Sequence, residues 1–111
     1  MKKRIKNSEL SEYLRSGVST IHGTGLFAKR VIKKGDYIGT YHGPVAKRNG
    51  TYVLWVYEHG DEDNAVGRSG KNLLRYLNHA KPGNAEFEDF DLYARKNIKI
   101  GDELTFDYEP D

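Results

Sequence analysis

Short apolar segments, separated by turn-forming residues, run along most of this chain. From Val18 onward many of them are rich in β-branched and aromatic residues and are bounded by glycine, proline or asparagine, a pattern that favours strands over helices. The predicted strands cover residues 18–21, 26–32, 37–41, 51–57, 85–90, 92–94, 97–101 and 103–106. We therefore expect a single, mainly β domain.

The first 17 residues follow a different pattern. Asn7 or Ser8 can cap a short helix over residues 8–14, and Gly17 is expected to end it. We therefore divide the chain into an N-terminal arm or short helix, residues 1–17, and a domain over residues 18–111. Residues 58–71 are polar and glycine-rich, which predicts a loop.

The composition limits the class of protein. The chain has 111 residues, enough for one domain with one core. It has no cysteine, which excludes disulfides, a thiolate nucleophile and cysteine-bound zinc. It shows no signal-peptide pattern and no apolar run of roughly 20 residues, so we expect no membrane partner and an intracellular location, cytoplasmic with the nucleus also open.

Charge is distributed unevenly along the chain. Residues 1–34 carry nine basic and two acidic side chains, whereas residues 83–111 carry nine acidic and three basic ones. Either the two ends attract each other across one fold, or the acidic segment steers a basic ligand such as a lysine-rich peptide. The pI of 8.8 without an arginine-rich stripe gives little support to direct nucleic-acid binding, which we do not expect.

Several common catalytic motifs are absent from the sequence. The four histidines lack the spacing of a zinc site, so we expect no metal. There is no phosphate-binding GxxxxGK[ST] loop and no GxSxG turn around Ser69. The pair Gly23-x-Gly25, taken alone, predicts only a tight turn.

Three segments taken together indicate a family. Gly23-Thr-Gly25 is followed at a distance by Arg75-Tyr-Leu-Asn78-His79 and then by Glu103-Leu-Thr-Phe106-Asp-Tyr108. In this order and spacing, residues 18–108 resemble the SET-domain family of S-adenosylmethionine-dependent protein lysine methyltransferases. The resemblance implies several small curled β-sheets, with a C-terminal segment tucked under a preceding loop as a pseudoknot.

The resemblance also implies roles for individual residues. Those implied to bind S-adenosylmethionine are Gly23, Thr24, Gly25, Tyr52, Arg75, Asn78 and His79. Those implied to be catalytic, at the channel for the substrate lysine, are Tyr41, Phe106 and Tyr108. The Tyr108 hydroxyl would orient the amine, Phe106 would influence how many methyl groups are added, and Arg75 would mainly brace the segment before Asn78. Glu103 and Asp107 are expected to brace the last turn.

Some features depart from the family pattern. Ala80 stands where the family usually has serine, and no cysteine-rich zinc segment follows Tyr108. A second copy of the chain, the substrate or residues 1–16 would then close the lysine channel, and we expect a homodimer with a basic, lysine-containing protein segment as substrate. Two alternatives are a SET-like binding module with little turnover and a small basic nucleic-acid-associated protein that uses Lys2, Lys3, Arg4 and Lys6.

Overall fold

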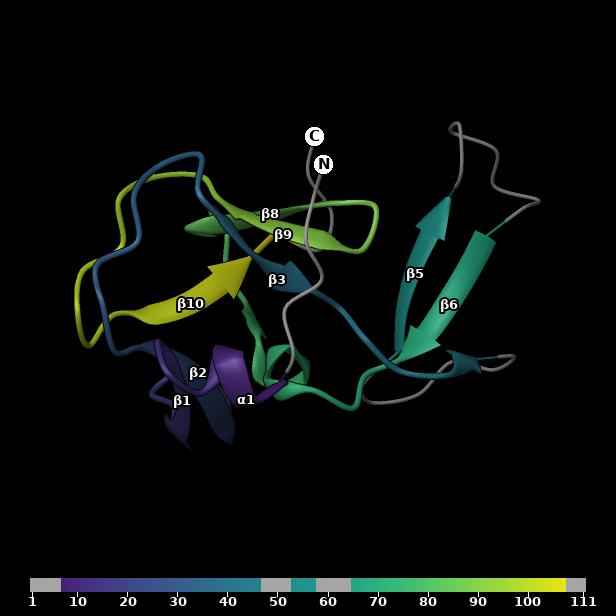
Figure 1. Cartoon of the computed structure of the whole chain (residues 1–111), viewed down its shortest axis with the longest axis horizontal. Helices are drawn as coiled ribbons and strands as arrows, with labels where there is room; N and C mark the ends of the chain where they lie inside the picture. The colour runs from purple at the N-terminus through teal and green to yellow at the C-terminus, as the bar shows by residue number, and fades with distance from the viewer. Residues whose placement is uncertain (1–6, 47–52, 58–64, 108–111) are drawn as a thin grey trace.

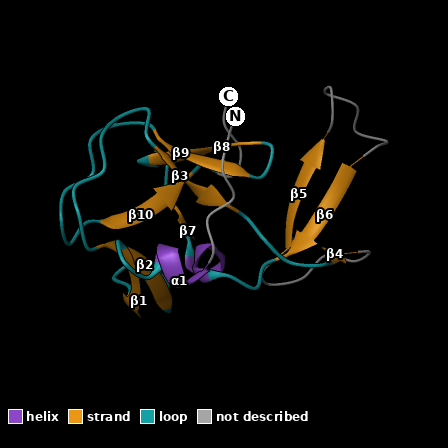
Figure 2. Cartoon of the chain, viewed as in Figure 1, coloured by secondary structure: helices purple, strands orange, loops and turns teal. Residues whose placement is uncertain are grey.

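In the computed structural model, which describes residues 7–46, 53–57 and 65–107, strands are the main regular structure (Figure 1 and Figure 2). The strands are β1 (Leu14–Val18), β2 (Thr24–Ala28), β3 (Tyr37–Thr40), β4 (Val45–Ala46), β5 (Val53–Tyr57), β6 (Ala65–Ser69), β7 (Asn78–His79), β8 (Ala85–Glu88), β9 (Asp91–Ala94) and β10 (Glu103–Phe106). Two short helices, α1 (Asn7–Leu10) and the 3-10 helix η3 (Leu73–Tyr76), complete the described elements.

The strands form two sheets. The larger sheet has the order β1-β2-β10-β8-β9-β3, with β7 also paired to β10, and the smaller sheet has the order β4-β6-β5. Figure 1 shows β5 and β6 on one side of the molecule and the larger sheet on the other. The mainly β fold class predicted from the sequence is confirmed.

The strand β10 has neighbours on both sides. Glu103 and Leu104 pair antiparallel with β2, whereas Thr105 and Phe106 pair parallel with β7, and β8 also pairs at Phe106. A strand close to the C-terminal end of the chain therefore connects parts of the sheet that come from its beginning and from its middle.

Residues 80–84 hold β10 in this place. Nδ2 of Asn84 donates to the carbonyl oxygen of Glu103 at 2.8 Å, and the N–H of Thr105 donates to Oδ1 of Asn84 at 2.9 Å. Gly83 packs so closely that an added Cβ would lie 2.5 Å from Cα of Phe106. The last described strand is thus tucked against the 80–84 loop, as the resemblance implied.

Two turns with nearly the same sequence, Ile32-Lys-Lys-Gly-Asp36 and Ile98-Lys-Ile-Gly-Asp102, have the same geometry. Gly35 and Gly101 have φ of 89° and 90°, a region that favours glycine. In each turn the aspartate carboxylate accepts a hydrogen bond from the N–H of the lysine three residues earlier. The two turns are joined by an antiparallel bridge between Ile32 and Ile98, so residues 97–101 form a bridge and a turn instead of the predicted strand.

The core includes the N-terminal segment. Among the described residues, the largest fully buried side chains are Leu10, Leu14, Leu26, Ile38, Leu74, Leu92, Ile98 and Leu104. Leu10 and Leu14 belong to the first 17 residues, so this segment packs into the sheet. No helix within residues 7–46, 53–57 and 65–107 is both long and apolar enough to cross a membrane.

Besides the strand predicted at residues 97–101, three further local predictions were wrong. The helix ends at Leu10 rather than continuing to residue 14, because Leu14–Val18 gains a full ladder of hydrogen bonds to β2, in which Gly17 pairs with Gly25. The predicted strand 18–21 ends at Val18, where the chain turns into β2.

The third error lies in the predicted loop 58–71, where Ala65–Ser69 forms β6 against β5. Gly67 permits this because an added Cβ would lie 2.8 Å from the Trp55 ring.

The Asn84 contacts give a test of how β10 is retained. Asn84→Ala removes a donor and an acceptor from the backbone of β10 and leaves both partly buried, so we expect the free energy of unfolding to fall by about 1–3 kcal/mol in urea denaturation. Asn97→Ala is the matched control, because Asn97 is exposed and only accepts a hydrogen bond from the Lys34 N–H. Equal losses in the two variants would contradict the role given to Asn84.

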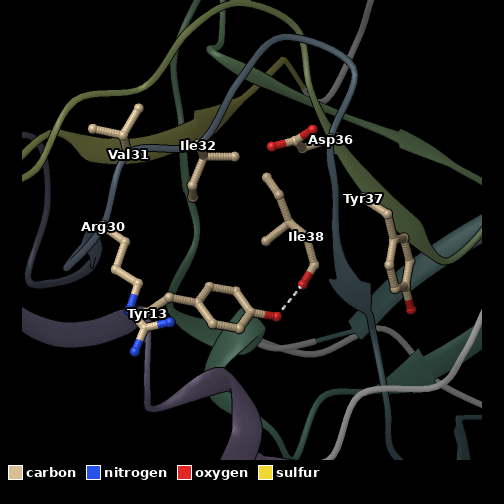
Figure 3. A pocket seen from close by; sticks show the side chains of 7 residues that line it. All are labelled: Tyr13, Arg30, Val31, Ile32, Asp36, Tyr37 and Ile38. Atoms are coloured by element: carbon tan, nitrogen blue, oxygen red, sulfur yellow. Dashed lines mark hydrogen bonds between the residues drawn. The ribbon is translucent and has the colours of Figure 1, made fainter.

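Tyr13 gives a pH-dependent test of the N-terminal packing. Its hydroxyl donates to the Ile38 carbonyl at 2.7 Å, and it lines a cavity of about 300 Å³ together with Arg30 and Tyr37 (Figure 3). Burial, followed by the charge of Tyr37, raises the pKa of Tyr13 from 10.0 to about 12. In the unfolded chain the proton leaves near pH 10, so folding binds this proton more tightly, and the free energy of unfolding should fall as the pH rises above 10.

Tyr13→Phe lacks this titration. The stability difference between the wild type and Tyr13→Phe should therefore shrink between pH 10 and about 12 in urea denaturation, as the wild type loses its advantage. A difference that stays constant over that interval would show that Tyr13 ionises equally well in the folded protein.

Candidate functional site

Two groups of predicted site residues are attached to β10. Asn78 and His79 pair with its second half, in the register Thr105 to Asn78 and Phe106 to His79. The N–H of Ala80 also donates to the Phe106 carbonyl at 3.1 Å. The side chains along β10 then contact the glycine turn before β2 at one end and aromatic residues of β8 at the other.

The first group joins the glycine turn to Asn78 through Glu103. Nδ2 of Asn78 donates to the carbonyl oxygens of His22 at 2.9 Å and Thr24 at 3.4 Å, and to Oε2 of Glu103 at 2.9 Å. The Ser19 hydroxyl donates to the Glu103 carboxylate at 2.8 Å. That same hydroxyl oxygen accepts N–H groups of the turn, from residues 21 and 22, so the turn and Asn78 are held by one network.

This network determines which way the Asn78 amide faces. A carboxylate and two carbonyl oxygens can only accept hydrogen bonds, so they bind the NH2 end of the amide. Oδ1 of Asn78 is therefore directed away from them, and it accepts no hydrogen bond within the described part of the chain. The site thus presents an acceptor beside a turn that is already rich in acceptors, an arrangement that favours a cationic donor.

The two glycines of the turn differ in what surrounds them. Gly23 has φ of 48°, and an added Cβ would meet nothing within 4 Å, so space beside it is open. At Gly25 an added Cβ would overlap the Glu103 carboxylate and lie 2.9 Å from Cβ of Ser19. Gly25 is therefore required by the packing of Glu103, whereas Gly23 leaves room for a ligand.

The second group is a chain of aromatic rings. Tyr41, which is 6% exposed, contacts Phe87 edge to face, with ring centroids 5.9 Å apart. Phe87 in turn contacts Phe106 edge to face at 5.2 Å. The absence of a side chain at Gly70 leaves space for the Tyr41 hydroxyl. Phe87 thus brings Tyr41 and Phe106, two residues predicted to be catalytic, into one cluster.

Arg75 and Asn72 brace the segment before β7. The Arg75 guanidinium donates to the Lys71 carbonyl at 2.8 Å and to the Tyr76 hydroxyl at 2.7 Å, so it is committed to its own segment. Asn72 donates to the Thr40 carbonyl at 2.8 Å, and its Oδ1 is buried with no hydrogen-bond partner among the described residues. An unpaired buried acceptor costs roughly 1–3 kcal/mol, which marks Asn72 as a polar group kept at a cost beside the end of β3.

The remaining predicted residues have simpler positions. Thr24 and His79 are exposed, at the start of β2 and the end of β7. Tyr52 and Tyr108 lie outside the described residues. In the described ranges, no group of three or more histidine or acidic side chains is placed to hold a metal ion.

Sequence reasoning did not select Ser19 or Phe87. Ser19 stands inside the predicted strand 18–21, four residues before Gly23, and only the fold brings it to Glu103, 84 residues later. Phe87 stands in a segment predicted to be a strand, and nothing in the sequence separates it from other strand aromatics. Glu103, by contrast, was indicated by the sequence through its place in the Glu-Leu-Thr-Phe motif.

Several known proteins are similar to this chain. The sequence model of the SET domain matches residues 23–109. Over 86% of its length the chain is 28% identical to a histone-lysine N-methyltransferase, H3 lysine-4 specific, of Mycosarcoma maydis, and it covers 8% of that protein. It is 32% identical over 84% of its length to the histone-lysine N-methyltransferase trr of Drosophila melanogaster, covering 5% of it.

A third relative is the N-lysine methyltransferase KMT5A of Xenopus tropicalis. This chain is 25% identical to it over 87% of its own length and covers 36% of that protein. The chain therefore spans a minor part of the length of these relatives.

Solved structures share the fold. The methyltransferase domain of human PR domain-containing protein 2 matches with a TM-score of 0.71 and 24% identity over 90% of this chain and 79% of that one. The methyltransferase domain of human SETMAR matches with a TM-score of 0.73 and 22% identity over 86% of this chain and 44% of that one. Since the family model covers most of the chain and the fold agrees, this protein belongs to the SET-domain family.

Proposed function

We propose that this chain transfers methyl groups from S-adenosylmethionine to lysine side chains of a protein substrate. The relatives named above are lysine methyltransferases by name. The observation that carries the proposal is the Asn78 amide, which Glu103 holds with its acceptor outward beside the open turn at Gly23. The strand that carries Glu103 also carries Phe106 of the aromatic cluster.

The acceptor-rich turn fits the chemistry of S-adenosylmethionine. The amino-acid end of this cofactor bears an ammonium group, which can donate a hydrogen bond to Oδ1 of Asn78. Its sulfonium adds a second positive charge. The Glu103 carboxylate and the carbonyls of His22 and Thr24 make the same region favourable for cations. When bound, S-adenosylmethionine would supply a methyl group activated by the positively charged sulfur. A solved structure of the same fold, ctPRC2, is described as bound to this molecule.

The aromatic cluster would act on the substrate amine. Free lysine has a pKa near ~10.4, and its amine attacks only when neutral. Apolar walls disfavour the ammonium form and lower that pKa, and they exclude water that would solvate the nitrogen. Tyr41, Phe87 and Phe106 supply such walls. Tyr108 remains a proposed catalytic residue, whose hydroxyl would orient the amine.

The β8–β9 hairpin indicates the substrate class. Phe87 of the aromatic cluster lies in β8 between the exposed carboxylates of Glu86 and Glu88, and Asp89 and Asp91 continue this acidic surface around the turn. A negative surface next to the proposed lysine site attracts positively charged segments. We infer that the substrate is a basic protein segment.

Cofactor binding can be tested by calorimetry with S-adenosylmethionine. Asn78→Ala should weaken binding by roughly 5- to 150-fold, since loss of a polar contact in a partly buried site costs about 1–3 kcal/mol. Glu103→Gln should also weaken binding, because a glutamine amide can donate as well as accept and no longer fixes the orientation of Asn78. Asn97→Ala, an exposed asparagine on another turn, is the control and should bind as the wild type does.

The outcomes of that titration separate the alternatives. Absence of saturable binding by the wild type would end the proposal. Binding without transfer of labelled methyl groups to any basic protein would instead support the SET-like binding module. Wild-type affinity in Glu103→Gln would show that Glu103 only braces the turn.

Phe106 gives a test of the lysine site. Phe106→Tyr adds a hydroxyl at the aromatic cluster that can hold a water molecule in the space a methylated amine would occupy, so the product should shift toward monomethyl-lysine. Mass spectrometry of a lysine-rich protein incubated with the cofactor measures the number of methyl groups. Phe27→Tyr, on β2 beneath Arg15, is the control. The same product distribution in the wild type and Phe106→Tyr would remove Phe106 from the lysine site.

A further inference from the structure

The three basic residues of the acidic C-terminal segment fold onto the basic segment near the N-terminus. Arg95, Lys96 and Lys99 are the basic side chains of residues 83–111. The bridge between Ile32 and Ile98 and the hydrogen bond from the Lys34 N–H to Oδ1 of Asn97, at 2.9 Å, place their loop beside residues 29–34. Figure 1 shows both loops side by side at one edge of the molecule.

The resulting surface is strongly positive, and we call it the basic face. Its charged side chains are Lys29, Arg30, Lys33, Lys34, Arg95, Lys96 and Lys99, all of them exposed. Residues 28–36 and 94–102 together carry seven basic and two acidic side chains, whereas the rest of the chain carries eleven basic and fourteen acidic ones. The positive charge of the molecule is therefore concentrated here.

Within the part of the chain that the structure describes, most of this charge has no ionic partner. The two carboxylates of the basic face, Asp36 and Asp102, accept hydrogen bonds from backbone N–H groups of their own turns. The charged groups of Arg30, Lys33, Lys34, Lys96 and Lys99 form no ion pair or hydrogen bond within the described residues. Like charges held within a Debye length of about 10 Å repel each other, so the arrangement costs folding energy that a bound polyanion would recover.

We propose that the basic face binds the phosphate backbone of nucleic acid, without regard to sequence. Lysine is depleted in protein–protein interfaces, which rely on aromatic anchors, whereas lysine and arginine are the usual contacts to phosphate. The basic face has five lysines, and the sequence of residues 28–36 and 94–102 contains no aromatic residue. Its composition therefore fits phosphate better than an acidic protein segment.

Charge counted along the sequence, with a pI of 8.8 and no arginine-rich stripe, gave little support to nucleic-acid binding. The stripe forms only when two segments more than 60 residues apart are paired, as in the contact between residues 34 and 97, which are 63 residues apart. Arg30 also lines the cavity of about 300 Å³ in Figure 3, so the basic face has a recess at its edge.

The test uses fluorescence anisotropy of a labelled 20-base-pair DNA duplex of mixed sequence, titrated with the full chain at several KCl concentrations. We expect affinities of roughly 10⁻⁶–10⁻⁴ M and a slope of log K against log salt near −4, since each phosphate contact contributes about −0.9. Lys34→Glu and Lys99→Glu should each reduce affinity at least about tenfold and flatten the slope by about one. Lys71→Glu, which changes the net charge equally at an exposed site outside the basic face, should change affinity less than about twofold.

Four outcomes would overturn the proposal. The first is absence of binding by the wild type at about 50 mM KCl. The second is an equal loss of affinity in the Lys71→Glu control. The third is tighter binding of a polyglutamate of about 20 residues than of the duplex, which would assign the face to an acidic protein. The fourth is loss of binding only when Lys2, Lys3, Arg4 and Lys6 are changed to glutamine, which would assign the activity to the N-terminus. Circular dichroism of each variant checks that the fold is retained.

Discussion

The pairing of β10 on both of its edges is the constraint on which the rest of the structure depends. This strand lies late in the sequence, and it pairs with β2 on one edge and with β7 and β8 on the other. Asn84 holds it there with two hydrogen bonds to its backbone. Such long-range pairing loses chain entropy before it gains contacts. What it provides is proximity, because Asn78 pairs with this strand, Glu103 of the strand lies against the glycine turn, and Phe106 of the strand belongs to the aromatic cluster.

The same constraint explains which parts of the site are rigid. Glu103 is fixed by the strand that carries it, and it fixes Ser19 and Asn78 in turn. Because a carboxylate only accepts, the orientation of the Asn78 amide follows from its neighbours before any ligand arrives. Such preorganisation reduces the ordering that a ligand must impose when it binds.

Much of the fold could be predicted from the sequence, since strands such as β3, β5 and β9 are short apolar stretches between clear turn signals. The motifs also selected Asn78, Phe106 and the glycine turn. Local pattern failed where tertiary contacts decide the structure. Residues 11–14 have a helical pattern, but burial of Leu14 and the ladder to β2 start a strand at Leu14, after a turn over residues 11–13. Ser19 and Phe87 carry no local signal, because their contacts are to Glu103 and Tyr41, far away in the sequence.

The strand β9 has a consequence for how the whole molecule behaves in an electric field. It begins at Asp91, beside Asp89, and ends at Ala94, directly before Arg95 and Lys96. Four residues of extended chain, roughly 13 Å, therefore separate a negative end from a positive one. These four charged side chains therefore form a local dipole along the strand, in a chain whose net charge is only +2. The field of a polyanion would exert a torque on this local dipole, turning Arg95 and Lys96 toward the polyanion and the acidic turn away from it.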